Sequence, residues 1–177
     1  DNDRVTLDLP KGGKVSGEYD MILNDKVDDV KSASPWSYEN KFADFNTLNA
    51  GDSFGYVSQL VGYAAAAGKD IGGWWVVNKA NGSFKYVSAE EANSKEVLEK
   101  IEDTYEYIDK DEPFERCFDA VPETYRKKPS GNMKLGSGCR FCDHRFKCWP
   151  TLQALPSRVS QAKDKPIVEY VSVTEAA

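Results

Sequence analysis

Residues 17–32 read Gly-Glu-Tyr-Asp-Met-Ile-Leu-Asn-Asp-Lys-Val-Asp-Asp-Val-Lys-Ser, two β-rich runs on either side of an Asn24-Asp25 turn. This pattern predicts a hairpin. Side chains alternate between the two faces of a strand, so Asp29 and Lys31 are expected on one face of the second run. Asp20, near the start of the first run, can lie beside Asp29 across the pair. The hairpin therefore predicts two neighbouring carboxylates and an ammonium group.

This trio suits the hydrolysis of a phosphodiester. Two close carboxylates repel each other, and a hard cation such as Mg²⁺ or Mn²⁺ relieves the repulsion by binding oxygens of both. Such a metal polarises a phosphoryl oxygen and makes hydroxide from water, while a nearby lysine stabilises the added charge. Asp20 and Asp29 are therefore candidate metal ligands, and Lys31 is a candidate catalytic residue. The alternative is that all three are ordinary solvated charges on exposed strands.

Outward from the hairpin, periodicity and turn residues predict the remaining elements. Strands are expected at Val5–Leu9, Val15–Leu23, Val27–Ser32, Gly72–Asn78 and Ser83–Ser88, and helices at Ser53–Ala67 and from Ala89, capped by Ser88, to about Asp109. The C-terminal part is expected to be loop-rich. Alternating strands and helices predict an α/β fold with a mixed β-sheet flanked by helices. A length of 177 residues suits one domain.

Three spaced motifs add specificity to the hairpin: Gly17-x-x-Asp20, Asp29-x-Lys31 and, on the following predicted helix, Gln59-x-x-x-Tyr63. In this order they resemble the motif series of the RecB-like branch of the PD-(D/E)XK nucleases. The resemblance implies a restriction-endonuclease-like fold for a single domain over residues 1–177. It further implies the site residues Asp20, Asp29, Lys31, Gln59 and Tyr63, with the metal bound at Asp20, Asp29 and Val30. Gln59 and Tyr63 share a helical face, which ordinary helix packing also explains.

Members of this family carry a helical segment upstream of these motifs, often with a His or acidic residue that completes the metal site. No equivalent precedes Val5, and because Asp1 is not an initiator Met, we expect the missing helices in residues upstream of it. The single histidine, His144, lies far along the chain. It is a candidate DNA contact or alternative metal ligand, or else an exposed loop imidazole.

All four cysteines lie in the last third of the chain, as Cys117 and then Cys139-x2-Cys142-x5-Cys148. Thiolates at this spacing suit a soft metal or an iron–sulfur cluster, although disulfides and buried thiols are alternatives. The pattern resembles the [4Fe-4S] staple of AddB-type and CRISPR-associated RecB-like nucleases. The fourth ligand of that family lies upstream of the nuclease motifs, and Cys117 is the available substitute. A structural Zn²⁺ site is the competing assignment for residues 117–149.

Charge is strongly segregated along the chain, although the net charge of −6 argues against a protein that coats nucleic acid indiscriminately. Residues 90–124 hold thirteen acids against four bases, whereas residues 126–147 hold seven bases against Asp143 alone. Arg140, Arg145 and Lys147 are candidate DNA contacts, because bases interleaved with aromatic residues suit a strand-gripping surface. The same aromatic residues could instead shield a metal, and the charges could be solvated faces.

Taken with these patterns, the resemblance implies a metal-dependent DNA nuclease, and more specifically an exonuclease. The resemblance further implies a role in recombination, repair or phage replication, action on single-stranded DNA or DNA ends, and a helicase or recombination partner. The alternatives are a metal-stapled nucleic-acid-binding or adaptor module without its own catalysis and a zinc-ribbon interaction protein. No apolar run is long enough to cross a membrane, so we expect a soluble protein. In line with the resemblance, we expect it in the cytoplasm of a bacterial or phage-infected cell.

Overall fold

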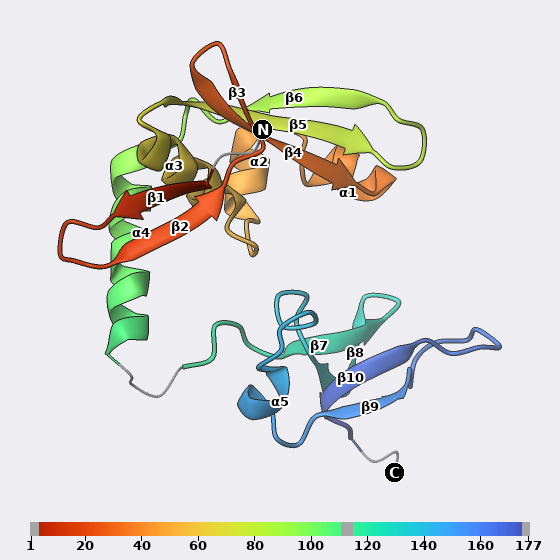
Figure 1. The fold of residues 1–177 in the computed structure, drawn as a ribbon. Coiled ribbons are helices and arrows are strands. Elements are labelled where there is room, and N and C mark those ends of the chain that lie inside the picture. Colours follow the sequence, from red (N-terminus) through yellow and green to blue (C-terminus); the bar gives the residue numbers. More distant parts are fainter. Residues whose placement is uncertain (1–3, 111–114, 175–177) are drawn as a thin grey trace. The chain divides into compact units, whose positions relative to one another are not determined.

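The computed structural model describes residues 4–110 and 115–174, shown as a ribbon in Figure 1. The chain divides into two compact units, Asp1–Glu112 and Pro113–Ala177. Each unit buries its own apolar residues, for example Trp74 in the first and Tyr170 in the second. Sequence length leads us to expect one domain over residues 1–177. The expectation of a single nuclease domain remains a prediction; what the structure shows is two compact units, each with its own core.

A four-stranded mixed sheet organises unit 1, in the order β3-β4-β5-β6 (Figure 1). The central pair β4–β5 is parallel, and both outer pairs are antiparallel. The strands are β3 (Met21–Leu23), β4 (Lys26–Ala33), β5 (Asp70–Asn78) and β6 (Phe84–Ser88). The β3–β4 turn at Asn24 and Asp25 has positive φ at both residues, the backbone that tight hairpins require. The predicted α/β class with a mixed sheet is confirmed at this level.

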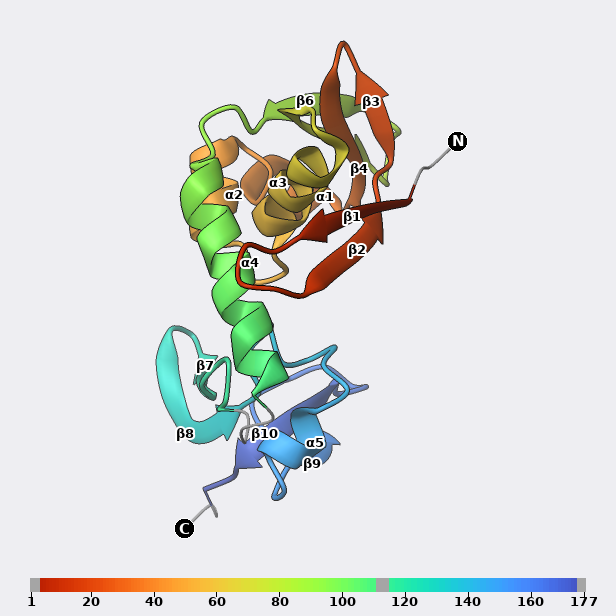
Figure 2. The same cartoon turned by 60° about the vertical axis from the view of Figure 1, so that its left-hand side comes forward.

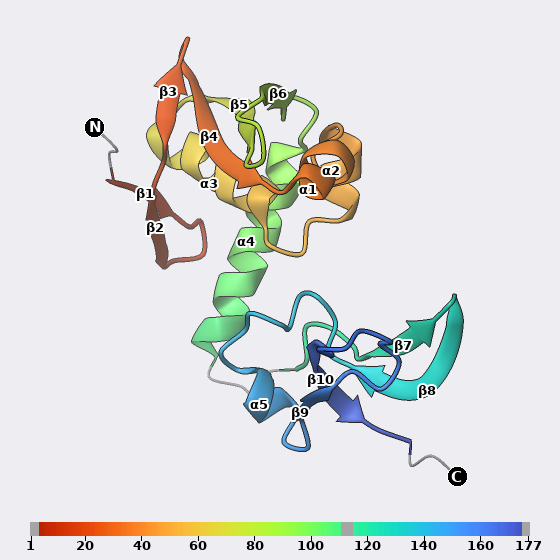
Figure 3. The ribbon, with the colours of Figure 1, turned by 90° about the vertical axis from the view of Figure 1, so that its right-hand side faces the viewer.

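Three helices connect the parallel strands β4 and β5 and cover one face of the sheet (Figure 3). They are α1 (Pro35–Asn40), α2 (Phe45–Ala50) and α3 (Tyr56–Ala67). Parallel strands need such a crossover. Leu48, Leu60 and Val61 from these helices pack with Trp74 and Val76 of β5 into the core of the unit. The core-facing side chains of β4 are therefore directed toward α3.

The two short helices α1 and α2 were not predicted from sequence. Each is only six residues long, too short for apolar periodicity to reveal, and each begins at a capping side chain. Ser34 accepts a hydrogen bond from the Ser37 amide, and Asp44 accepts one from the Thr47 amide. The predicted helix at Ser53–Ala67 exists, but it starts at Tyr56.

The strand predicted at Val15–Leu23 is two strands, so that prediction was wrong. β2 (Lys14–Glu18) pairs with β1 (Arg4–Asp8) in a separate two-stranded sheet, and β3 belongs to the large sheet. The break falls at Tyr19 and Asp20. Tyr19 is buried in the core, and the Asp20 carboxylate accepts a hydrogen bond from the Val30 amide. The chain therefore changes sheets at the first acidic motif residue.

The long helix α4 (Ser94–Asp109) runs beside α3 and the turn between β1 and β2 (Figure 2). The Lys11 amide of that turn donates to the Glu102 carboxylate at 2.7 Å. The helix was predicted to start at Ala89, but it starts at Ser94 behind an Asn93 cap. The cause is the strand before it: the Ala89 amide donates to the Gly72 carbonyl, which extends the β-sheet bonding past Ser88.

Unit 2 contains a four-stranded antiparallel sheet in the order β7-β8-β10-β9. Its strands are β7 (Val121–Tyr125), β8 (Lys128–Lys134), β9 (Gln153–Pro156) and β10 (Ile167–Ser172), with the short helix α5 (Arg145–Cys148) between β8 and β9. The region was predicted to be loop-rich. Its strands escape detection because β8 is polar and packs polar side chains around the buried Glu123. Within the described parts of both units, no helix has the length and apolar character needed to span a bilayer.

Candidate functional site

Asp29 and Lys31 lie on the face of β4 that is turned toward the helices. The Lys31 Nζ atom is 2.6 Å from Asp29 Oδ2, and their side chains are only 20% and 5% exposed. The alternation expected from sequence therefore holds: the two charged groups are neighbours, one residue apart on the same face. A close ion pair in a shielded position holds the ammonium group in one place.

Asp20 joins the pair from the break between β2 and β3. Its Oδ2 atom accepts a hydrogen bond from the Val30 amide at 2.7 Å, which fixes Asp20 against the centre of β4. The pKa of Asp29 is raised above its ordinary value, first by burial and further by the charge of Asp20, although Lys31 opposes the shift. The two carboxylates are therefore close enough to repel each other, as the hairpin predicted.

The third motif reaches the same place from α3. Lys31 Nζ donates to Gln59 Oε1 at 3.2 Å, and Gln59 Nε2 donates to the Tyr63 hydroxyl at 3.2 Å. Lys31 thus contacts β4 on one side and α3 on the other. The structure brings all five predicted catalytic residues together, in a continuous chain of polar contacts from Asp29 to Tyr63.

Gly17, the first motif residue, lies against the Tyr63 ring. A Cβ atom at position 17 would stand 2.5 Å from Tyr63 Cε1, far inside normal contact distance. The glycine is therefore needed for the close approach of the ring to β2, and the ring in turn holds the Gln59 amide. This explains in physical terms why a glycine precedes Asp20 by three residues.

The donors beside Lys31 suit a hard divalent cation. Asp20 and Asp29 supply carboxylate oxygens, and Val30 could supply only its backbone carbonyl oxygen. Across residues 4–110 and 115–174 no group of three or more His, Cys, Asp or Glu side chains is placed to hold a metal ion. A metal here would consequently bind through two carboxylates, a carbonyl and water, a donor set that Mg²⁺ commonly accepts.

The sequence reasoning missed a second cation beside this cluster. Lys41, at the end of α1, has its Nζ atom 4.5 Å from the Tyr56 ring centroid and 4.7 Å from that of Phe54. Lys31 Nζ lies 5.2 Å from the same Tyr56 centroid. Both ammonium groups therefore contact the Tyr56 ring. Burial lowers the pKa of Lys41. The sequence does not predict that Lys41 reaches Tyr56, because α2 and a loop separate the two residues along the chain.

All four cysteines belong to unit 2 and are free thiols. Burial raises the pKa of Cys139, Trp149 opposes this, and the thiols of Cys142, Cys148 and Cys117 raise it further. The Cys117 segment is tied to this place by Arg116, whose Nε atom donates to the Cys148 carbonyl at 2.9 Å and whose guanidinium stacks on Trp149. Four thiolates suit Zn²⁺ or an iron–sulfur cluster by their chemistry. In the described part of the chain, however, no three Cys, His, Asp or Glu side chains are placed to hold a metal ion, and this holds for the cysteines as well.

The predicted DNA-contacting bases differ in their surroundings. Arg145 Nε donates to Glu169 at 3.0 Å, and its NH1 group donates to the Cys142 carbonyl, so this guanidinium is engaged within unit 2. Arg140 and Lys147 are exposed. His144 is also exposed, and its carbonyl accepts from the Lys147 amide at the start of α5. The exposed side chains of Arg140 and Lys147 are accessible to a ligand. Arg145 instead bonds to Glu169 and so connects α5 to β10.

No protein-family model, no curated protein and no solved structure matches this chain. The geometry described above is therefore the basis for a functional proposal.

Proposed function

We propose that this protein is a metal-dependent DNA nuclease of the RecB-like PD-(D/E)XK kind, with its active centre at Asp20, Asp29 and Lys31. One observation carries the proposal: Lys31 contacts Asp29 at 2.6 Å and Gln59 at 3.2 Å, and Gln59 in turn contacts Tyr63. Asp29 and Lys31 lie on β4, and Gln59 and Tyr63 lie on α3, so residues from two elements meet at one place.

Each residue has a role that follows from its position. Asp20, Asp29 and the Val30 carbonyl would hold Mg²⁺ or Mn²⁺, which when bound polarises a phosphoryl oxygen and acidifies water. Lys31 stabilises the negative charge that develops on the phosphate, and its contacts with Asp29 and Gln59 keep it preorganised for that purpose. Tyr63 holds the Gln59 amide.

Lys41 and the ring of Phe54 extend the centre toward the neighbouring part of a substrate. The Lys41 ammonium group contacts the same Tyr56 ring as Lys31 and suits the next phosphate of a strand. Phe54, which is 55% exposed, offers a surface on which an unpaired base can stack. This arrangement favours single-stranded DNA or frayed ends, and therefore an exonuclease.

The cysteine cluster is proposed to hold a [4Fe-4S] cluster, with Zn²⁺ as the alternative, in a structural role through Cys117, Cys139, Cys142 and Cys148. Four protein ligands leave no open position for chemistry. An anaerobically purified sample should be brown with absorbance near about 400 nm. A colourless protein with stoichiometric zinc would instead establish the alternative.

The experiment is cleavage of end-labelled single-stranded, duplex and circular DNA by the purified full-length chain, with Mg²⁺, with Mn²⁺ or with EDTA. We expect metal-dependent release of short products from linear DNA and resistance of circular DNA. Lys31→Ala and Asp29→Asn should each lower the rate by about 100-fold or more, since they remove charge stabilisation or a metal ligand.

The matched control is Lys79→Ala, which removes an exposed lysine after β5 and should leave cleavage unchanged. Circular dichroism of every variant checks the fold. Absence of cleavage of any DNA by the wild-type chain, or full activity of Lys31→Ala, would refute the proposal and favour a binding module.

A further inference from the structure

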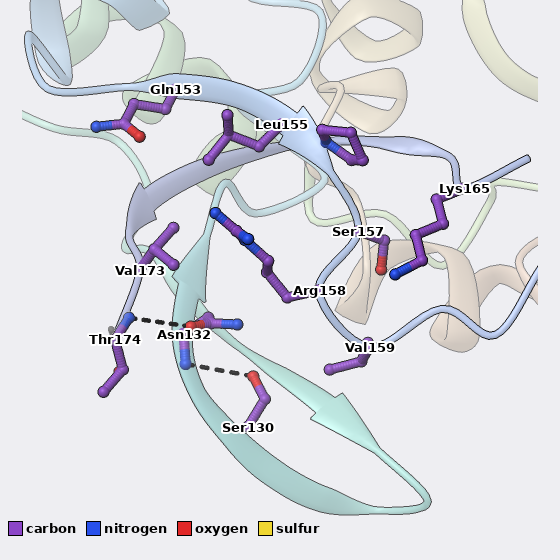
Figure 4. Close-up of a pocket in the computed structure, with 11 residues that line it drawn as sticks. Ser130, Asn132, Gln153, Leu155, Ser157, Arg158, Val159, Lys165, Val173 and Thr174 are labelled. Carbon is purple, nitrogen blue, oxygen red and sulfur yellow. Dashed lines mark hydrogen bonds between the residues drawn. The ribbon is translucent and has the colours of Figure 1, made fainter. Parts of the chain in front are cut away.

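A groove of about 1060 Å³ crosses unit 2, and no cysteine lines it (Figure 4). It lies over the sheet at β8, β9 and the residues after β10, and the segment between β9 and β10 closes one side. The side chains that define its chemistry are Ser130, Asn132, Gln153, Arg158 and Lys165. The groove is thus lined mainly by polar groups and two cations.

The two cations of the groove are available to a ligand. Neither Arg158 nor Lys165 has an ion pair with any residue in the described part of the chain, and no acidic side chain lines the groove. In Figure 4 the Arg158 side chain extends over the groove floor, with Lys165 on the loop beside Ser157. Unpaired cations next to neutral hydrogen-bonding groups make a site for anions.

Buried hydrogen bonds hold the floor of the groove in place. The Glu123 carboxylate, only 2% exposed, accepts from Asn132 at 2.8 Å and from the Tyr170 hydroxyl at 2.6 Å. The Tyr170 hydroxyl also accepts from the Arg158 amide at 2.8 Å, so the backbone that carries Arg158 is anchored. Because the carboxylate is enclosed by donors, it organises the groove from below without lining it. A preorganised site loses less entropy on binding.

The two units differ in the sign of their net charge. Unit 2 carries eleven Lys and Arg against seven Asp and Glu, a net charge of +4, whereas unit 1 carries twelve against twenty-two, a net charge of −10. A polyanion is repelled by the overall charge of the unit that holds Asp29 and Lys31, and attracted by the other. An enzyme acting on DNA with this distribution needs its sequence-independent phosphate contacts mainly in unit 2.

We propose that this groove binds the sugar–phosphate backbone of single-stranded DNA, with Arg158 and Lys165 as direct phosphate contacts. The identity of the polyanion rests on the proposed nuclease function, but the binding site does not need the active centre. Asn132 and Gln153 add neutral donors for phosphate or sugar oxygens, which favour no particular base.

The experiment measures fluorescence anisotropy of a labelled single-stranded oligonucleotide with the full-length protein in EDTA, where no cleavage occurs, over a series of salt concentrations. Arg158→Ala and Lys165→Ala should each weaken binding about five- to tenfold at low salt. The double variant should lower the slope of log K against log salt by about 1.4, because each lost phosphate contact removes about 0.7 for a single strand.

Lys163→Ala is the matched control, since it removes one exposed lysine of the same loop that does not line the groove. Its binding and salt slope should stay at the wild-type values. Equal losses in all three variants would show diffuse charge rather than a site, and an unchanged slope in the double variant would also overturn the proposal. If dTMP at the same phosphate concentration displaces the oligonucleotide, the groove is a mononucleotide site and not a site for a DNA strand.

If the wild-type protein binds the oligonucleotide through the groove residues but does not cleave it, the groove proposal holds and the proposed nuclease function fails. If the wild type cleaves DNA but the groove variants bind it as well as the wild type does, the proposed function stands and the groove proposal fails. The two proposals therefore fail separately.

Discussion

At the scale of single residues, the candidate site depends on a glycine that has no chemistry of its own. Gly17 permits the Tyr63 ring to lie against β2, and Tyr63 accepts the hydrogen bond that orients Gln59 toward Lys31. Asp29 depends on its surroundings in another way, since burial and Asp20 together disfavour its charge. Two substitutions test these dependencies.

Gly17→Ala should lower stability by about 1–3 kcal/mol, because its methyl group collides with the Tyr63 ring. Displacement of the ring should also lower DNA cleavage by disturbing Gln59. Gly62→Ala is the control: its Cβ atom would make an ordinary contact 3.5 Å from Ile101 Cδ1 of α4. Because Gly62 lies in the interior of α3, helix propensity should raise stability by up to about 1 kcal/mol. Chemical denaturation measures both. Equal stability of Gly17→Ala and wild type would disprove the role of this contact.

Asp29→Asn should raise the melting temperature of the metal-free protein at neutral pH. A carboxyl group whose pKa is higher in the folded chain than in the unfolded chain favours folding when protonated, and this contribution is lost as pH rises through the raised pKa. The stabilisation by Asn should therefore shrink as pH falls and Asp29 takes up a proton. Melting curves across this pH range measure the effect. Added Mg²⁺ should stabilise the wild type alone, and a lower melting temperature of the variant at neutral pH would contradict the prediction.

At the scale of elements, a buried carboxylate joins three neighbouring strands on the side of the sheet opposite the candidate site. Asp28 of β4 accepts hydrogen bonds from the Gly73 amide and Trp75 indole of β5 and from the Tyr86 hydroxyl of β6. A Cβ atom at Gly72 would stand 1.9 Å from Asp28 Oδ1, so this glycine provides the room for the carboxylate. Three donors on one buried acceptor hold the central strands in register.

Asp28→Asn should therefore destabilise unit 1 by about 1–3 kcal/mol, because an amide nitrogen would face donors and leave some of them without an acceptor. The matched control is Asp25→Asn. Asp25 pairs with Lys69 at an exposed turn and has positive φ, a backbone that Asn tolerates, so little change is expected there. Urea denaturation of the two variants compares them. Equal stability of the two would exclude the proposed role of Asp28.

At the scale of the whole molecule, the candidate catalytic groups and the net positive charge belong to different units. Unit 1 contains Asp20, Asp29 and Lys31 within a net charge of −10, and unit 2 contains the groove, the cysteines and a net charge of +4. Binding of DNA should consequently rest on a set of phosphate contacts, whereas the chemical step rests on a shielded cluster of a few residues. Salt separates these two contributions.

Raising the salt concentration from about 50 to 200 mM should increase KM for single-stranded DNA on the order of tenfold or more, with kcat nearly unchanged, because bound cations are no longer released as favourably. Bis(p-nitrophenyl) phosphate, a small monoanionic diester, is the control substrate. Its hydrolysis needs the active centre but few other contacts, so its KM should respond weakly to salt. Similar salt responses for the two substrates would speak against this division of labour.

Much of the candidate site could be predicted from local sequence. Strand alternation places Asp29 beside Lys31, and helical spacing places Gln59 beside Tyr63. These are short-range consequences of backbone geometry. Lys41 could not be predicted in the same way, because its approach to Tyr56 depends on how α1 and the loop after α2 pack. The polar sheet of unit 2 was missed as well, since the donors around Glu123 come from separate strands and loops.

The sequence by itself determined the α/β class, the order of most elements of unit 1, the faces of its motif residues and the concentration of cysteine and positive charge near the C-terminus. All of these follow from turn chemistry and from the periods of strands and helices. Only the tertiary structure decided that the chain forms two units, that β2 and β3 belong to different sheets, and that Lys31 lies between Asp29 and Gln59. Those outcomes depend on burial and on hydrogen bonds between segments far apart in the chain, which no local pattern encodes.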